Sequence, residues 1–152
     1  MLDRANHLWI DEARAPLYVV APPDCSDSEV NLLFRACDAI YADLTHDVAW
    51  VLDATDSRNV SAKSRRIVAD HLRRNRLVMM TYVAGIAVVI PNALMRGVFT
   101  AITWLVPLEF PHQVVQTREQ GVVWAEQALR ERQLLRLSMT DAARAHLPAS
   151  KR

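Results

Sequence analysis

The sequence predicts an α/β fold in which a mostly parallel or mixed four-stranded sheet is covered by helices. Short apolar runs alternate with longer segments whose apolar residues recur every three or four positions, in the order βαβαβαβα. The chain has 152 residues, of which 51% are hydrophobic and 23% charged, and this suits one globular domain. Only three glycines stand against seven prolines, without low-complexity tracts, so collagen-like and disordered chains are excluded.

The first half of the chain reads as strand, helix, strand. Residues 16–21 form a short apolar run that two prolines end, which is typical of a strand. Ser26 or Asp27 can cap the helix that follows, and its apolar stripe extends over residues 27–45. Residues 48–53 predict a second strand, whose mostly apolar side chains indicate a central position in the sheet.

The middle of the chain repeats this alternation. Ser61 can cap a helix whose apolar spacing runs to about Tyr82. Residues 85–90 predict a third strand of β-branched and small side chains. Residues 91–92, Pro-Asn, then open a third helix, which Pro107 ends.

The last part of the chain predicts a strand over residues 112–117 and a long helix after it. Thr117-Arg-Glu-Gln120 matches the Ser/Thr-x-x-Glu/Gln capping box at the start of that helix. Beyond Ser138 the residues are small and polar, as in a short helix or a frayed tail. We therefore expect a single domain over residues 1–138 and a C-terminal tail over residues 139–152.

One uncharged stretch, residues 77–95, has the length of a membrane span. Gly85 divides it, and a β-branched run and a Pro-Asn break follow, so a helix, a turn and a buried strand explain it better than a bilayer span. The N-terminus lacks the apolar region of a signal peptide, and Cys25 and Cys37 form neither a disulfide framework nor a CxxC motif. We expect a cytoplasmic protein.

Charge is segregated along the chain. Residues 1–56 hold eleven acids and three bases, whereas residues 57–152 hold fifteen bases and six acids. The most basic cluster comprises Lys63, Arg65, Arg66, Arg73, Arg74 and Arg76. It is either a solvated helix face that meets the acidic first helix, within one chain or between subunits, or a surface for an acidic partner. No aromatic residues interleave with the bases and no helix-turn-helix or zinc pattern accompanies them, so we do not expect nucleic acid as the partner.

The sequence carries no recognised catalytic or cofactor motif. Glycine-rich phosphate loops, a GxSxG elbow and metal-ligand spacings of histidine are all missing, so we expect no enzyme activity, cofactor or metal. Polar side chains are densest where the second strand ends, at Asp53, Thr55, Asp56 and Ser57. A receiver domain also needs a lysine after a later strand, and none is present there. Asp53 alternatively ties down its loop through backbone N–H groups.

Two passages resemble a known family. The first runs from Trp50-Val-Leu-Asp53 to Ser61-Ala-Lys-Ser64 and resembles the STAS domain of anti-sigma-factor antagonists, together with the related CRAL-TRIO-type lipid-transfer sheets. The second, over residues 85–105, is similar to bacterial STAS-like proteins of comparable length. The resemblance covers about residues 14–132 and implies a regulatory domain that binds a protein partner.

The resemblance also implies a switch site. In STAS antagonists a serine at a helix N-terminus is phosphorylated by a partner kinase, and by position this serine is Ser61, with Ser57 as the alternative. Where the family usually has aspartate before the serine, this chain has Val60, and Ala62-Lys63 replaces the usual Ser-Gly after it.

We therefore expect a non-enzymatic regulatory module for protein–protein interaction, with the switch located in residues 53–64. A phosphate on Ser61 adds negative charge at the positive end of a helix, beside basic side chains. The alternative is a small-molecule or lipid carrier with an apolar pocket under the third helix. The residues expected to line that pocket are Phe99, Ile102, Trp104 and Phe110.

A final expectation is self-association into a homodimer or larger assembly. Large apolar side chains gather at and after the end of the third helix, namely Trp104, Leu105, Leu108 and Phe110. An exposed apolar patch of this kind is typical of a contact surface. The alternative is that these side chains close the core of a monomer.

Overall fold

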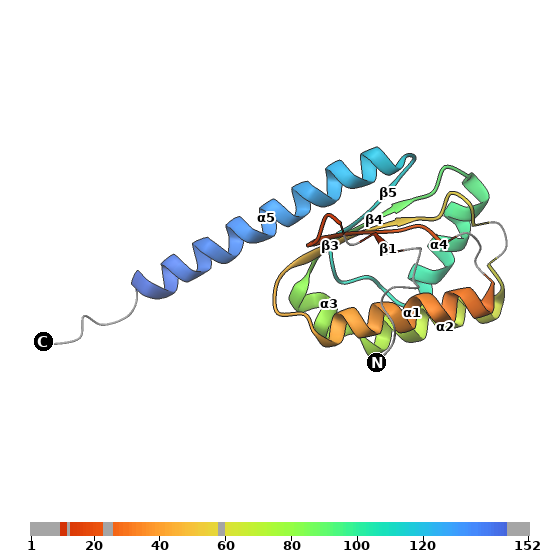
Figure 1. The fold of residues 1–152 in the computed structure, drawn as a ribbon, viewed down its shortest axis with the longest axis horizontal. Helices are drawn as coiled ribbons and strands as arrows, with labels where there is room; N and C mark the ends of the chain where they lie inside the picture. Colours follow the sequence, from red (N-terminus) through yellow and green to blue (C-terminus); the bar gives the residue numbers. More distant parts are fainter. Residues whose placement is uncertain (1–9, 12, 23–25, 58–59, 146–152) are drawn as a thin grey trace, which may run out of the picture.

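The computed structural model describes residues 10–11, 13–22, 26–57 and 60–145. Over these residues the chain is an α/β fold with a five-stranded mixed sheet and five helices (Figure 1). The predicted alternation of strands and helices is confirmed. The sheet, however, has five strands where the sequence predicts four.

The additional strand is β1 (Ile10–Asp11), which lies at one edge of the sheet and pairs antiparallel with β2 (Leu17–Val20). Two residues are too few to show any periodicity, so sequence patterns do not reveal this strand. The next strands are β3 (Val48–Asp53), β4 (Val83–Val89) and β5 (His112–Val115). Each pairs parallel with its predecessor, so the order across the sheet is the order along the chain.

Five helices accompany these strands. They are α1 (Asp27–Ala42), α2 (Ala62–Arg74), α3 (Arg76–Tyr82), α4 (Ala93–Leu105) and α5 (Arg118–Ala145). The sequence predicts one helix from Ser61 to Tyr82, but the chain breaks it at Asn75 into α2 and α3. The Asn75 side-chain amide donates to the His71 carbonyl at 3.1 Å and to Asp38 Oδ1 at 2.7 Å, which stabilises the end of α2.

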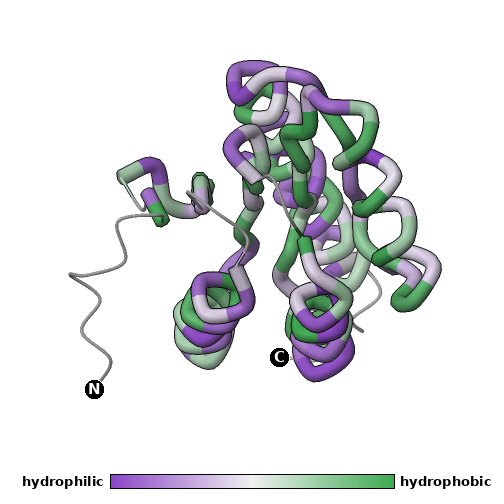
Figure 2. Tube along the Cα trace, turned by 90° about the vertical axis from the view of Figure 1, so that its right-hand side faces the viewer, coloured by the Kyte–Doolittle hydropathy of each residue, from purple (hydrophilic) through white to green (hydrophobic). Residues whose placement is uncertain are grey.

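Because the strands follow one another across the sheet and parallel crossovers are right-handed, the connecting helices gather on one face. Figure 1 shows α1 to α4 on that face and α5 on the other. The strand residues alternate accordingly. Tyr18, Val20 and Trp50 pack with α1 and α3, whereas Val19 and Val51 share a core with α5. Figure 2 shows hydrophobic and hydrophilic residues alternating around the helices, as expected where each buries one side.

Helix α5 packs closely on the sheet over its first half. A Cβ at Gly85 would lie 2.8 Å from the Trp124 ring, and one at Gly121 would lie 3.0 Å from Val51. Further along, Arg136 forms two hydrogen bonds with the buried carboxylate of Asp47, at 2.5 and 2.6 Å. These contacts fix α5 across the strands.

The expected domain boundary at Ser138 lies inside α5, which continues to Ala145. The side chains of residues 137–144 are exposed, and in Figure 1 this end of the helix projects away from the sheet. Residues 146–152 of the expected tail lie outside the described residues.

The uncharged stretch of residues 77–95 forms most of α3, all of β4 and the start of α4. Within the described ranges, no helix combines the length and the apolar character needed to cross a membrane.

Candidate functional site

The start of α2 joins the start of α1 through two serines and one aspartate. Ser61 is the N-cap of α2, and its Oγ accepts a hydrogen bond from the Ser64 backbone N–H at 2.9 Å. The hydroxyls of Ser61 and Ser64 both donate to Oδ1 of Asp27, each at 2.6 Å. Ser64 is fully buried and Ser61 is exposed. The expected switch residue is therefore a surface hydroxyl bonded to a neighbouring helix.

The charge of Asp27 is stabilised by these contacts. The hydrogen bonds from Ser61 and Ser64 hold the pKa of the Asp27 carboxyl below its ordinary value. Lys63 Nζ adds an ion pair at 3.7 Å from Oδ2. Asp27 therefore stays ionised, and it belongs to the site although the sequence interpretation gives it only a capping role at α1.

The other residues of the expected switch loop are arranged differently. Asp53 is buried and accepts hydrogen bonds from the Thr55 hydroxyl at 2.5 Å, the Thr55 backbone N–H at 3.0 Å and Arg118 Nε at 2.7 Å. Partial burial opposes its ionisation, yet the hydrogen bonds from Thr55 and Arg118 hold the Asp53 pKa below its ordinary value. These contacts fit the interpretation in which Asp53 ties down its loop, and they also anchor the start of α5.

The two candidate phosphorylation sites differ in access. Ser57 is only 4% exposed, so a kinase cannot reach its hydroxyl unless the loop opens, whereas Ser61 lies at the surface. Thr55 and Asp56 are exposed beside Ser57.

The six basic residues of the expected partner surface fall into two groups. Four have acidic partners: Lys63 with Asp27, Arg73 with Asp70, Arg74 with Asp38, and Arg76 with Glu109. Two of these pairs join α2 to α1, as the intramolecular interpretation of the basic helix expects. Arg65 and Arg66 have no ion pair with any residue that the structure describes.

The expected apolar interface is only partly at the surface. Trp104 is 81% and Leu105 55% exposed, and Leu94 on the same helix is 75% exposed. Phe110 is buried in the core, and Leu108 packs against the same core cluster. Phe110 therefore does not belong to an exposed patch, and the exposed members of this apolar group, Trp104 and Leu105, lie on α4.

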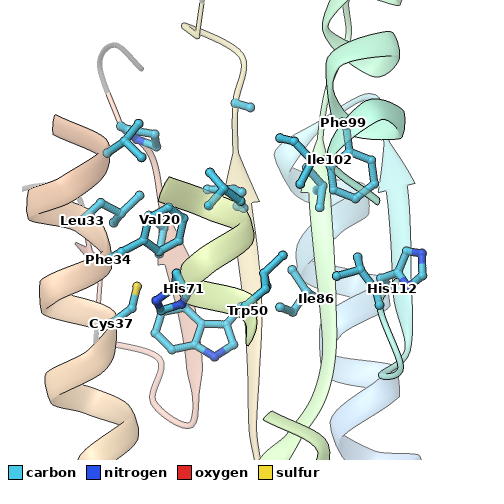
Figure 3. A pocket seen from close by; sticks show the side chains of 18 of the residues that line it. Val20, Leu33, Phe34, Cys37, Trp50, His71, Ile86, Phe99, Ile102 and His112 are labelled. Carbon is cyan, nitrogen blue, oxygen red and sulfur yellow. The ribbon is translucent and has the colours of Figure 1, made fainter. Parts of the chain in front are cut away.

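A partly open cavity of about 180 Å³ lies between the sheet and the helices on this face. Figure 3 shows its walls: Leu33 and Phe34 come from α1, His71 from α2, Phe99 and Ile102 from α4, and Trp50 from the sheet. Phe99, Ile102 and Phe110 line it as the sequence predicts. Trp104 does not, because it lies on the opposite, solvent-facing side of α4.

His71 is a polar residue of the cavity wall whose role the sequence interpretation misses. Its side chain is 2% exposed, stacks on Phe34 with ring centroids 4.2 Å apart, and places Nδ1 2.9 Å from Asp38 Oδ1. Asp38 and His71 lie on different helices and form no local motif. In the sequence, the only signs of this pair are a histidine on the apolar face of α2 and an aspartate on α1.

Within the described part of the chain, no cluster of three or more His, Cys, Asp or Glu side chains is placed to hold a metal ion. Cys37 is a free, buried thiol, and burial raises its pKa to about 12. A comparison of the chain with known proteins finds no matching family model and no similar curated sequence.

Proposed function

We propose that this chain is a non-enzymatic regulatory module of the STAS-like kind, which binds a protein partner and is switched by phosphorylation of Ser61. One observation carries the proposal. The exposed hydroxyl of Ser61 donates to Asp27 of the neighbouring helix, so a change at Ser61 acts directly on the junction of α1 and α2.

A phosphate at Ser61 has two opposing effects. It adds about −1.5 to −2 charges at the positive end of α2, close to Lys63 and Arg65 in the chain, which stabilises it locally. It also removes the proton that Ser61 donates to Asp27 and places two anions side by side. We expect Lys63 to turn from Asp27 to the phosphate, and the two helix starts to separate.

The partner surface in this proposal consists of the exposed faces of α2 and α4. Arg65 and Arg66 supply positive charge from α2. Trp104 and Leu105 supply apolar area from α4, which touches α2 where Arg73 Nη2 donates to the Leu105 carbonyl at 3.4 Å. The partner is accordingly a protein with an acidic and apolar surface, and a second copy of this chain is one such protein.

The test compares partner recovery by immobilised Ser61→Asp and Ser61→Ala proteins, with retained proteins quantified by mass spectrometry. We expect at least one protein to be retained by one variant and lost with the other. Ser138→Asp is the matched control, because Ser138 is an exposed helical serine far from Asp27 and should bind as the unmodified chain does. Equal recovery with both Ser61 variants would refute the switch.

A further inference from the structure

The cavity between the sheet and α4 has the size and walls of a ligand site. Its volume of about 180 Å³ exceeds the roughly 150 Å³ of an engineered apolar cavity that stays dry and binds benzene. Aromatic and aliphatic side chains form nearly all of its surface, including Phe34, Trp50 and Phe99. The cavity is partly open, so a ligand can enter it, and apolar walls that face water are costly unless something covers them.

One buried pair gives the cavity a defined polar group. Nδ1 of His71 lies 2.9 Å from the carboxylate of Asp38, and a carboxylate only accepts hydrogen bonds. Nδ1 therefore carries the proton and donates it to Asp38. In this tautomer the other ring nitrogen, Nε2, is an acceptor.

Nε2 has no hydrogen-bond partner among the residues that the structure describes, whereas Nδ1 is engaged by Asp38 and lies 3.2 Å from the Asn75 amide. His71 also lines the cavity, so Nε2 is the ring nitrogen left for a ligand (Figure 3). Burial lowers the pKa of His71 to about 4, although Asp38 favours the protonated form. The imidazole is consequently neutral at pH 7 and keeps its acceptor lone pair.

We propose that this cavity binds a small apolar molecule of one or two fused rings that carries one hydroxyl or N–H group, and that His71 Nε2 accepts its hydrogen bond. This proposal is independent of the switch at Ser61. Phe99 and Ile102 hold the ligand against the sheet from the side of α4. Asp38 does not touch the ligand but fixes the His71 tautomer, and is thus a positioning residue.

Indole and indene form a matched pair of probes, because they have nearly the same shape and only indole has an N–H. The 152-residue chain, refolded from denaturant so that the cavity starts empty, is titrated with each by calorimetry. A neutral hydrogen bond contributes about 0.5–1.5 kcal/mol, so we expect indole to bind roughly two- to thirteenfold more tightly than indene. Equal affinities would refute the acceptor, and the absence of binding by either probe would refute the site.

Two variants locate the acceptor. His71→Phe keeps a ring against Phe34 but removes Nε2, and should reduce the affinity for indole to that for indene. His112→Phe is the matched control, because His112 also lines the cavity but is exposed to solvent whereas His71 is buried, and this variant should keep the preference. A His71→Phe protein that still prefers indole would overturn the assignment.

Asp38→Ala provides a second measurement that does not depend on replacing a buried ring. Asp38 is half-exposed, and without it the nearest group to Nδ1 is the Asn75 amide, a donor. The proton should then move to Nε2, and the preference for indole should disappear. The ¹⁵N chemical shifts of the imidazole report the tautomer directly, and an unchanged tautomer with an unchanged preference would refute the positioning role of Asp38.

Discussion

At the scale of single residues, buried polar side chains join elements that are distant in the sequence. Asp47 binds Arg136 of α5, Asp53 binds Arg118 of α5, and His71 binds Asp38 of α1. A buried charge without such a partner is costly, so these pairs specify where the helices dock as much as they stabilise them.

His71 makes stability depend on pH. Its pKa is about 4 in the folded chain and about 6.5 in an unfolded one, because burial opposes the charge even with Asp38 nearby and Arg74 opposes it further. The unfolded state therefore binds more protons between these values, and the free energy of unfolding falls as the pH falls through this window. We expect a loss of about 2 kcal/mol between pH 7 and pH 5 in urea denaturation.

The matched variant for this prediction is His71→Phe, which should show a much smaller loss over the same interval. Asp27 and Asp53 have lowered pKa values, so their contributions are present above the ordinary carboxyl range and are lost at more acidic pH. An equal loss in His71→Phe and in the unmodified chain would contradict the prediction.

Two glycines allow a paired test of packing. Gly85→Ala places a Cβ 2.8 Å from the Trp124 ring, and overpacking of this kind should lower the free energy of unfolding by about 1–3 kcal/mol. In Gly97→Ala the added Cβ lies on the exposed side of α4 with no atom within 4 Å. This substitution should raise the free energy of unfolding by about 0.5–1 kcal/mol, because alanine has the higher helix propensity. Thermal denaturation measures both, and the same sign for both would be inconsistent with this packing.

At the scale of elements, strands and helices with several apolar turns are predictable from the sequence. Residues 27–45 and 48–53 predict α1 and β3 almost at their observed bounds, because each buries a long periodic or continuous apolar face. The break between α2 and α3 is not predictable in this way. It depends on Asn75 bonding to Asp38, which is 37 residues away.

In the candidate site, too, local sequence predicts some features and tertiary contacts decide the others. Ser61 is predictable as a cap from local sequence, whereas its bond to Asp27 requires α1 and α2 to lie side by side. The pairing of His71 with Asp38 likewise exists only after the helices pack. Local patterns therefore find single functional groups, and tertiary contacts decide which of them act together.

Helix α5 should tolerate truncation only beyond Arg136, whose side chain pairs with Asp47. Ending the chain after Leu137 removes described residues whose side chains are exposed, and should change stability by less than about 0.5 kcal/mol. Ending it after Glu131 removes Arg132 and Arg136 and leaves Asp47 buried without them, which should cost about 2–4 kcal/mol.

Urea denaturation measures both truncations. An Arg132→Ala, Arg136→Ala double variant of the full chain separates the loss of charge partners from the loss of helix. If this variant is as stable as the unmodified chain, Asp47 does not anchor α5.

At the scale of the whole molecule, we predict self-association. We expect the contact to involve exposed residues of α4 and not Phe110, which is buried. Leu94, Trp104 and Leu105 are exposed on one helix that has apolar residues on its buried side as well. We expect analytical ultracentrifugation at micromolar concentration to show a dimer that survives high salt and is lost with Trp104→Glu. Phe110→Glu is unsuitable for this test, because Phe110 is buried and the substitution would disrupt the core.

The control for this measurement is Leu77→Glu, since Leu77 is equally exposed at 75% but lies on α3. It should leave the dimer intact. A monomer at both low and high salt would contradict the prediction, as would a dimer that Trp104→Glu leaves unchanged.

During synthesis the sheet can form from its N-terminal strands onward, because its strand order is the chain order. Each parallel strand joins a neighbour that has already been made, so β2, β3 and β4 can assemble with α1 to α3 as the chain emerges. The opposite face, with Val19, Val51 and Val89, has no cover until α5 leaves the exit tunnel. Until then the nascent chain exposes this apolar face to the cell, and the docking of α5 covers it.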